Sequence, residues 1–335
     1  MIKAFFKNHH IHKNIVPYFD YIFVFRPTLY FAVWVMICIG MYLAHLDNSI
    51  PQWETAFNYK ILLLFISLTL ITGATFITNQ LTDIITDRNN NKLFLIDNLI
   101  DQGKAKYIYK SSILVGILLL ILTNIYNFIL GALIFVFWDI LYNRKNYKWK
   151  KNPFLGPLCN LIVGLLFIIS GWIMVKSNNL YFPYIDFSLL NKLFLNIIGY
   201  VFCYLSVVLL TDIPDIKGDE MDNKRTFTIA FGKKITILLS TLLVFISFLI
   251  GIYLNDPLLS IATIVSFPFF LYALFRGLDK DVLRSIRYPI FILNFFTFTI
   301  YPYLSLTSLI VFYISKYYYW HRFDIHYPTF LVSND

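Results

Sequence analysis

Hydrophobic residues come along this chain in long, uninterrupted runs that are separated by short polar segments. The runs are about 17–25 residues long, the length that an α-helix rising 1.5 Å per residue needs to cross roughly 30 Å of hydrocarbon. Their continuity excludes the alternating pattern of a membrane β-barrel. The pattern predicts an all-α fold, a polytopic bundle of about nine transmembrane helices around a central cavity.

The apolar runs also give the expected boundaries of the helices. We predict spans over residues 22–46, 60–82, 109–126, 128–142, 154–175, 192–213, 232–253, 257–275 and 287–303. A further apolar stretch over 304–320 is a candidate tenth helix. No Pro/Gly/Ser-rich linker separates the runs, so we expect a single integral-membrane domain over 1–335 with its core at about 22–303.

Composition supports a membrane protein, because 58% of the residues are hydrophobic and only 14% are charged. The net charge of +9 raises the question of a nucleic-acid partner, but the basic residues follow membrane topology instead. With the N-terminus inside, nineteen Lys and Arg residues lie in or beside inner loops and three lie outside. We therefore expect a lipid bilayer and no nucleic acid as partner, in a multi-pass protein of a prokaryotic plasma membrane.

The first cluster of polar residues closes the second apolar run and contains Asn79, Asp83 and Asp87. Residues four apart on a helix differ by about 40° around its axis, so these side chains are predicted to share one face. Mg²⁺ commonly takes one or two carboxylates together with phosphate and water. The spacing therefore favours a Mg²⁺ site on the cytoplasmic side.

The second cluster closes the sixth apolar run and contains Asp212, Asp215 and Asp219, again with helical spacing. Pro214 can end or kink that helix, which would leave Asp219 on a loop. Topology places both clusters on the same side of the membrane, where they can face each other. Carboxylates in repeated register beside hydrocarbon are expensive to keep and mark ion or substrate sites.

With these two motifs the chain resembles the UbiA-type prenyltransferases, from about Arg26 to the ninth span. The second motif looks most like the branch that handles homogentisate or chlorophyllide acceptors. The resemblance implies that Mg²⁺ is the cofactor, an isoprenyl diphosphate the donor, and an aromatic quinone precursor or another lipid-biosynthetic molecule the acceptor. It also implies metal ligands, which are Asn79, Asp83, Asp87, Asp212 and Asp219, while Asp215 is a candidate to take the acceptor's proton.

Basic residues near these motifs are candidates to bind the diphosphate. Residues 141–153 resemble the family segment that precedes its fifth helix, and either Lys150 or Lys151 matches the family lysine. Lys or Arg in a low-dielectric site stabilises charge that develops on a leaving group. Further candidates are Arg88, Arg225 and Arg26, the last in an Arg-Pro segment similar to the start of the family's first helix.

The predicted reaction ionises the donor to an allylic cation, which aromatic faces stabilise and an electron-rich acceptor captures. Tyr142 is a candidate for such a face. The alternative function is a cation-coupled transporter, which also binds ions between membrane helices. Transporters usually hold these residues near the bilayer midplane, whereas here the carboxylates are predicted at helix ends.

Overall fold

The computed structural model describes residues 9–46, 58–90, 93, 95–177, 180–184 and 187–329. Within these ranges the regular structure is helical, and the only β feature is an isolated bridge between Ile96 and Ile100. The longer helices are α2 (His10–Phe23), α3 (Tyr30–His45), α5 (Tyr59–Thr82), α7 (Gln102–Ile121), α8 (Ile125–Phe135), α9 (Leu155–Lys176), α10 (Phe187–Leu210), α13 (Lys233–Tyr253), α14 (Pro257–Arg276), α15 (Asp279–Ile300) and α16 (Pro302–Phe323).

Short helical segments connect the long helices at the end of the bundle that carries the predicted motifs. They are the α-helices α6 (Ile84–Asn89), α11 (Ile216–Met221) and α12 (Phe227–Phe231), the 3-10 turns η1 (Pro27–Leu29), η3 (Trp149–Lys151) and η4 (Ile213–Asp215), and the π-helical segment η2 (Val136–Asn143) that continues α8.

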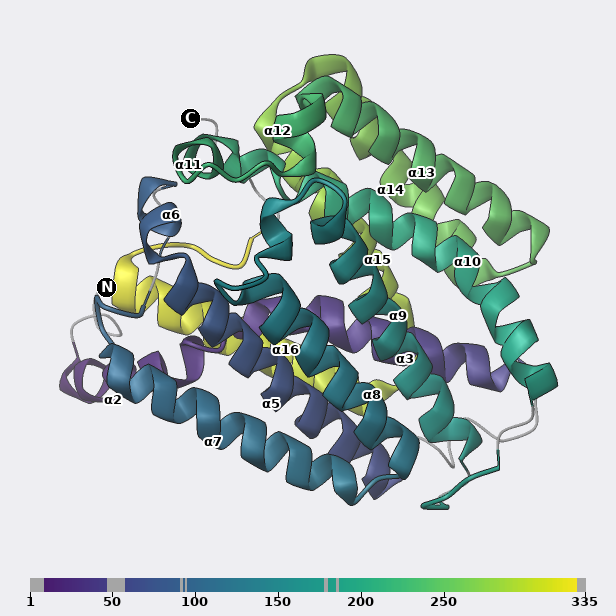
Figure 1. Cartoon of the computed structure of the whole chain (residues 1–335), viewed down its shortest axis with the longest axis horizontal. Coiled ribbons are helices and arrows are strands. Elements are labelled where there is room, and N and C mark those ends of the chain that lie inside the picture. The colour runs from purple at the N-terminus through teal and green to yellow at the C-terminus, as the bar shows by residue number, and fades with distance from the viewer. Residues whose placement is uncertain are drawn as a thin grey trace.

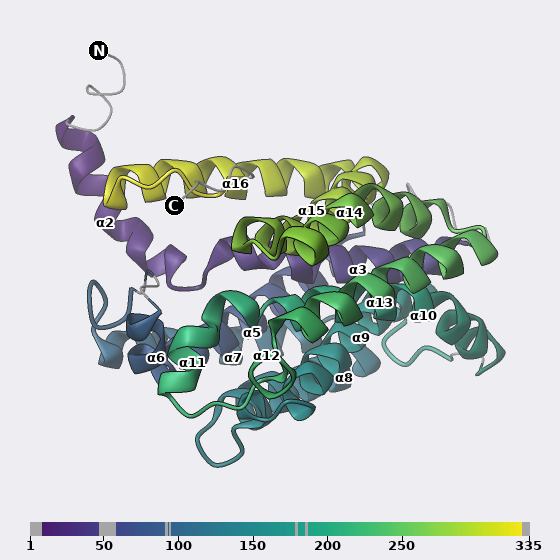
Figure 2. The ribbon, with the colours of Figure 1, turned by 90° about the horizontal axis from the view of Figure 1, so that it is seen from above.

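The long helices form a bundle in which α3 and α9 cross at the centre (Figure 1). A ring of contacts runs from α3 through α9, α10, α13, α14 and α15 and returns to α3, while α5, α7 and α8 pack on the other side of α3 and α9. Figure 2 shows α16 as an outer helix at one edge of the bundle, where it contacts α15, α2 and η1. The all-α, polytopic fold predicted from the apolar runs is confirmed.

Seven of the described helices are long and apolar enough to cross a membrane. They cover Pro27–His45, Tyr59–Thr82, Ile125–Asn143, Leu155–Lys176, Ser188–Met221, Lys233–Tyr253 and Pro257–Arg276. The predicted third and ninth spans are not among these seven. They correspond to α7, which begins with several lysines, and to α15, which begins with charged residues. Residues 302–323 form α16, which contains the stretch singled out as a candidate tenth helix.

Several predicted boundaries are wrong because capping residues, which hydropathy does not register, decide where helices start. Asn124 caps α8 by accepting a hydrogen bond from the Asn127 N–H at 2.9 Å, so the predicted span 109–126 runs past the end of α7. Asp101 starts α7 at Gln102 in the same way. The predicted first span, 22–46, contains a break in which Arg26 has a left-handed backbone with φ 50°.

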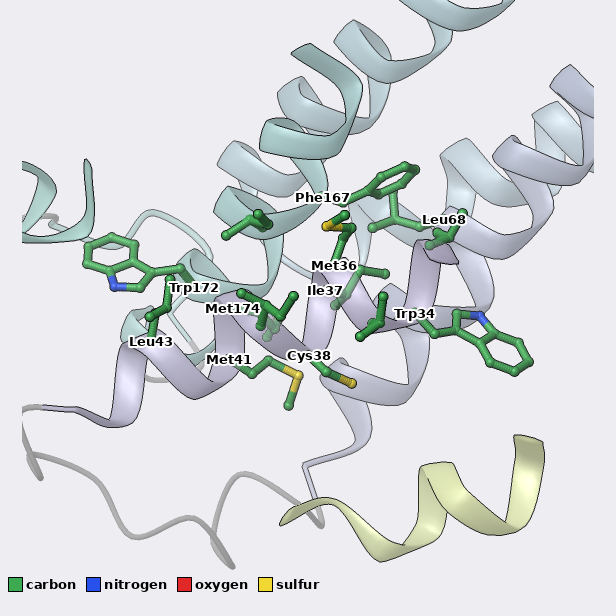
Figure 3. Close-up of a cluster of buried hydrophobic side chains, with 14 of the residues drawn as sticks. Trp34, Met36, Ile37, Cys38, Met41, Leu43, Leu68, Phe167, Trp172 and Met174 are labelled. Atoms are coloured by element: carbon green, nitrogen blue, oxygen red, sulfur yellow. The ribbon is translucent and has the colours of Figure 1, made fainter. Parts of the chain in front are cut away.

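The centre of the fold is a close crossing of α3 and α9. A Cβ atom on Gly40 would overlap the carbonyl oxygen of Ile168, and one on Gly171 would overlap the carbonyl oxygen of Ile37. Small residues allow helix backbones to approach this closely inside a membrane. Figure 3 shows the side chains of the buried hydrophobic cluster around this crossing, among them labelled residues of α3 and α9.

The two helices at the ends of the described chain are joined to each other. Asp20 of α2 is buried and accepts hydrogen bonds from the Tyr318 hydroxyl at 2.7 Å and from Arg322 Nη2 at 2.8 Å. The ring of Phe23 stacks on that of Tyr318 with their centroids 3.9 Å apart. This junction fixes the segment that leads from α2 into Arg26.

Candidate active site

The first motif lies where α5 ends and α6 begins. Asp83 is the last, capping residue of α5, and its backbone departs from helical geometry (φ −109°, ψ 16°). The chain nevertheless continues in helical register, because the Asp87 N–H donates to the Asp83 carbonyl at 2.8 Å. The break divides the predicted single face: Asn79 and Asp83 share one cationic partner, while Asp87 faces another.

That shared partner is Lys150 of η3, whose side chain is 7% exposed. Its Nζ lies 2.7 and 2.8 Å from the two carboxylate oxygens of Asp83 and 3.2 Å from Asn79 Oδ1. The Thr82 hydroxyl adds a fourth oxygen at 3.0 Å. Of the two candidate lysines, Lys150 is therefore the one at the motif oxygens.

The neighbouring Lys151 has a different partner. Its Nζ lies 3.2 Å from Asp222 Oδ2 and 3.0 Å from the Asp222 carbonyl oxygen. The Lys151 carbonyl accepts a hydrogen bond from the Arg225 N–H at 3.2 Å, which ties the two loops together. The side chains of Arg225 and Arg88 are exposed.

The second motif follows α10 and changes direction at Pro214, as the sequence indicated. Pro214 lies in η4, whose last residue Asp215 is the N-cap of α11, and Asp219 is therefore inside a short helix rather than on a loop. The Asp219 side chain is buried, and its Oδ1 lies 3.0 Å from Lys224 Nζ.

Lys224 joins the two motifs, because its Nζ also lies 3.7 Å from Asp83 Oδ2. Its position is held by its backbone N–H, which donates to the Asp219 carbonyl at 2.9 Å. Lys224 does not stand out in the sequence, since a lysine in an inner loop has the same appearance as any other charge of the positive-inside pattern.

A second contact brings the motifs face to face, as Figure 1 shows for α6 and α11. Asn90, at the end of α6, accepts a hydrogen bond from the Gly218 N–H at 2.7 Å and donates to the Asp215 carbonyl at 3.4 Å. A Cβ atom on Gly218 would lie 2.5 Å from the Asn90 side chain, so a larger residue at this position would displace the Asn90 amide from these hydrogen bonds.

Arg26 reaches the same end of the bundle from the break between α2 and α3. Its Nη2 donates to Asp87 Oδ2 at 3.2 Å, and the Asp87 side chain is 7% exposed. A non-glycine residue with positive φ is uncommon and points to a functional constraint. Arg26 is therefore a stronger candidate in the structure than it was in the sequence.

A series of aromatic side chains in contact with one another extends from the motifs into the bundle. Tyr142 of η2 lies within electrostatic reach of Asp212 and Asp83. One turn earlier, Trp138 Nε1 donates to Asn160 Oδ1 at 2.7 Å, and its ring lies 5.8 Å from that of Phe76. Further rings on this path are Tyr30, Trp34 and Phe167.

A buried carboxylate that the sequence analysis missed holds η2 in place. Asp139 is fully buried and accepts hydrogen bonds from Thr78 at 2.7 Å, from Tyr109 at 3.1 Å and from Arg144 at 2.9 and 3.0 Å. These contacts attach η2 to α5 and α7. π-Helical segments are frequent at functional sites, and this one orients Trp138 and Tyr142.

Burial and charge act in opposite directions on the two lysines of the cluster. Burial lowers the pKa of Lys150, and Asp83 offsets this effect only in part. Burial also acts to lower the pKa of Lys224, but Asp83 and Asp219 outweigh it and the pKa is raised. Lys224 is thus the more firmly charged of the two.

The donor set fits Mg²⁺ that arrives with a phosphate ligand. Among the described residues, no group of three His, Cys, Asp or Glu side chains forms a ready-made metal cage. Instead, oxygens of Asn79 and Asp83 converge on one cation, the Lys150 ammonium, which marks a place where positive charge is stabilised. A Mg²⁺ ion needs only one or two carboxylates when phosphate and water complete its shell.

Comparisons with known proteins agree with the sequence motifs. The profile of the UbiA prenyltransferase family matches residues 32–296. A digeranylgeranylglyceryl phosphate synthase of Methanosphaera stadtmanae is 25% identical over 227 residues, which cover 67% of this chain and 73% of that protein. The corresponding synthase of Methanobrevibacter smithii is 26% identical over 144 residues, 38% of this chain and 45% of that one.

Two solved structures share the fold. A UbiA homologue from Archaeoglobus fulgidus bound to DMAPP and Mg²⁺ has a TM-score of 0.59 at 12% identity and covers 84% of this chain and 99% of its own. The apo structure of a UbiA homologue from Aeropyrum pernix K1 has a TM-score of 0.61 at 13% identity, covering 83% and 97%. Together with the family match, they lead to one conclusion: the chain belongs to the UbiA prenyltransferase family and is an integral-membrane prenyltransferase.

Proposed function

We propose that this enzyme uses Mg²⁺ to transfer a polyprenyl group from an isoprenyl diphosphate to a lipid acceptor at the end of the bundle that carries the two motifs. The observation that supports it best is the meeting of Asp83 and Asp219, from motifs far apart in the sequence, at the ammonium group of Lys224. Carboxylates for a metal and lysines for an anion are thereby brought together.

The reaction breaks the bond between C1 of the prenyl group and the diphosphate oxygen, and the electron pair leaves with the diphosphate. Bound Mg²⁺ supplies neutralisation of the leaving group's charge. Lys150, Lys224 and Arg26 bind diphosphate oxygens, and the buried setting makes these interactions stronger than they are in water. The nucleophile of the acceptor lipid forms the new bond to C1 and loses its proton. Asp215 is our candidate for the base that takes this proton.

The rings of Tyr142, Trp138 and Phe76 stabilise the allylic cation and exclude water from it. The prenyl tail then lies among apolar helices. A cavity of about 30 Å³ between α3, α10 and α15, lined by residues such as Val35, Met36, Ile39, Cys203, Tyr204 and Leu293, marks a place where the bundle can open for it. The cavity has to widen when a donor binds.

For the acceptor we favour a prenylated glycerol phosphate over an aromatic ring. The curated relatives are digeranylgeranylglyceryl phosphate synthases, and their name supports an acceptor of this class. The exposed, basic Arg88 and Arg225 suit an anionic headgroup at the membrane surface. The distribution of Lys and Arg supports a cytoplasmic location for this end of the bundle.

A transporter function finds less support. The motif carboxylates Asp83 and Asp219 follow the ends of α5 and α10 instead of lying at the middle of broken helices. Midplane sites on broken helices are typical of secondary transporters. Family membership points in the same direction as this geometry.

The proposal is tested with the purified protein in lipid nanodiscs and radiolabelled geranylgeranyl diphosphate. Geranylgeranylglyceryl phosphate and homogentisate are offered as separate acceptors, with Mg²⁺ or with EDTA. We expect labelled product with the glycerol phosphate lipid and Mg²⁺ only. If product formed with homogentisate and not with the glycerol phosphate lipid, the proposed acceptor would be wrong. If product formed in EDTA, the proposed requirement for Mg²⁺ would be wrong.

A further inference from the structure

Two lysine ammonium groups are bound to the motif oxygens that we propose as metal ligands. Lys150 Nζ lies within 3.2 Å of four oxygens, two of them from Asp83. Lys224 Nζ lies 3.0 Å from Asp219 and 3.7 Å from Asp83. The side chains of all four residues are between 7% and 11% exposed, so this is a buried cluster of two positive and two negative charges.

The neutrality of this cluster restricts what can bind to it. A divalent cation that entered alone would leave two excess positive charges in a water-poor site, and uncompensated buried charge is costly. A diphosphate that entered alone would draw the lysines away and leave Asp83 and Asp219 facing an anion. Charge is balanced best when cation and anion enter together.

We propose that Lys150 and Lys224 hold the place of the metal in the resting enzyme and move to the diphosphate when Mg²⁺ takes the carboxylates, so that metal and diphosphate bind cooperatively. This inference rests on the proposed function. It assigns Lys224, which lies outside both motifs, to diphosphate binding. It also gives the enzyme a device against binding free Mg²⁺ or free diphosphate unproductively.

The exchange needs movement of side chains only. Lysine carries its charge on a flexible four-carbon stem, so the ammonium can turn from carboxylate to phosphate while its backbone stays in place. The backbone of Lys224 is tied to Asp219, and that of Lys150 lies in the short η3 turn. Arginine at either position would hold the carboxylate in a rigid fork and oppose the exchange.

The test measures metal binding without prenyl transfer. Mn²⁺ serves as the spectroscopic probe, and its affinity for the nanodisc-embedded enzyme is measured by electron paramagnetic resonance with and without inorganic diphosphate. In the wild type we expect diphosphate to raise Mn²⁺ affinity at least about fivefold, the lower end of usual coupling between sites. Lys150→Met and Lys224→Met should each bind Mn²⁺ more tightly than wild type without diphosphate and lose most of this enhancement.

Lys233→Met is the matched control, because Lys233 pairs with Asp279 at 2.6 Å on the exposed surface. It should behave as wild type. Equal Mn²⁺ affinity in the wild type with and without diphosphate would overturn the proposal, and so would weaker Mn²⁺ binding in both lysine variants without diphosphate. The wild-type result decides even where a variant fails to fold, and cooperative binding in a protein that transfers no prenyl group would reject the proposed function alone.

Discussion

The ammonium group of Lys150 lies between the two carboxylate oxygens of Asp83, at 2.7 and 2.8 Å, although 67 residues separate them in the sequence. The loop after η2 is thereby fixed against the end of α5. The next residue, Lys151, pairs with Asp222 instead, so the two neighbouring lysines lie in different environments.

This geometry predicts which lysine binds the diphosphate. Lys150→Met should lower kcat/KM for the isoprenyl diphosphate by about 100-fold or more, because a buried charge that stabilises the leaving group is removed. Lys151→Met should lower it by less than about tenfold, since that side chain is bound to a half-exposed partner. Steady-state kinetics with both variants decides the question, and a larger loss in Lys151→Met would reverse the assignment.

The junction of α2 and α16 should affect the position of the Arg26 side chain, although the residues of this junction lie outside the range 32–296 that matches the family. Asp20→Asn leaves Arg322 without its ion pair, and we expect a loss of about 1–3 kcal/mol in the free energy of unfolding. Because α2 leads directly into Arg26, KM for the diphosphate should rise as well. Thermal unfolding and kinetics are measured together.

Arg322→Lys is the companion variant, since it keeps the positive charge next to Asp20. Compared with Asp20→Asn, this variant should keep much more of the wild-type stability and a KM closer to that of the wild type. A stable Asp20→Asn protein with unchanged KM would show that the junction does not position Arg26.

The crossing of α3 and α9 predicts a stability effect without a change in chemistry. Gly171→Val places a branched side chain where the Ile37 carbonyl already lies, and overpacking of this kind costs about 1–3 kcal/mol or more. Gly277→Asn is the control, because nothing lies within 4 Å of its added Cβ and asparagine tolerates its φ of 66°. Thermal unfolding in detergent should separate the two, and equal stability would mean that the helices can move apart at no cost.

The aromatic path predicts a loss in kcat. Trp138→Leu removes a ring face from the site of the developing cation, where a desolvated cation–π contact is worth about 2 kcal/mol, or roughly 30-fold in rate. Tyr142→Phe keeps its ring and should stay within about threefold of wild type. Single-turnover rates test both variants. A greater loss in Tyr142→Phe would give the hydroxyl, rather than the ring, the functional role.

The sequence was sufficient for the fold class and the two motifs, because both depend on local patterns. Apolar runs of membrane length identify helices, and four-residue spacing identifies shared faces. The split between Asp83 and Asp87 was beyond this pattern, since the break at Asp83 depends on what α6 packs against. Asn90 and Gly218, which join α6 to α11, make a tertiary contact that spacing does not encode.

Lys224 and Asp139 were missed for a related reason. Lys224 is one inner-loop lysine among many until the fold places it beside Asp83 and Asp219. Asp139 lies inside an apolar run, and the hydropathy of its neighbours outweighs one carboxylate. Its partner Arg144 directly follows η2, but Thr78 of α5 and Tyr109 of α7 are distant in the sequence and come together with Asp139 only in the folded chain.

The most direct test of metal-assisted prenyl transfer is the rate of label transfer from geranylgeranyl diphosphate by three nanodisc-embedded proteins, with and without Mg²⁺. These are the wild type, Asp83→Asn and, as control, Asp279→Asn, which changes a carboxylate that is 72% exposed. We predict Mg²⁺-dependent transfer by the wild type and by Asp279→Asn, and a rate lower by about 100-fold or more in Asp83→Asn. Transfer by Asp83→Asn at the wild-type rate, or transfer that does not depend on Mg²⁺, would contradict the account.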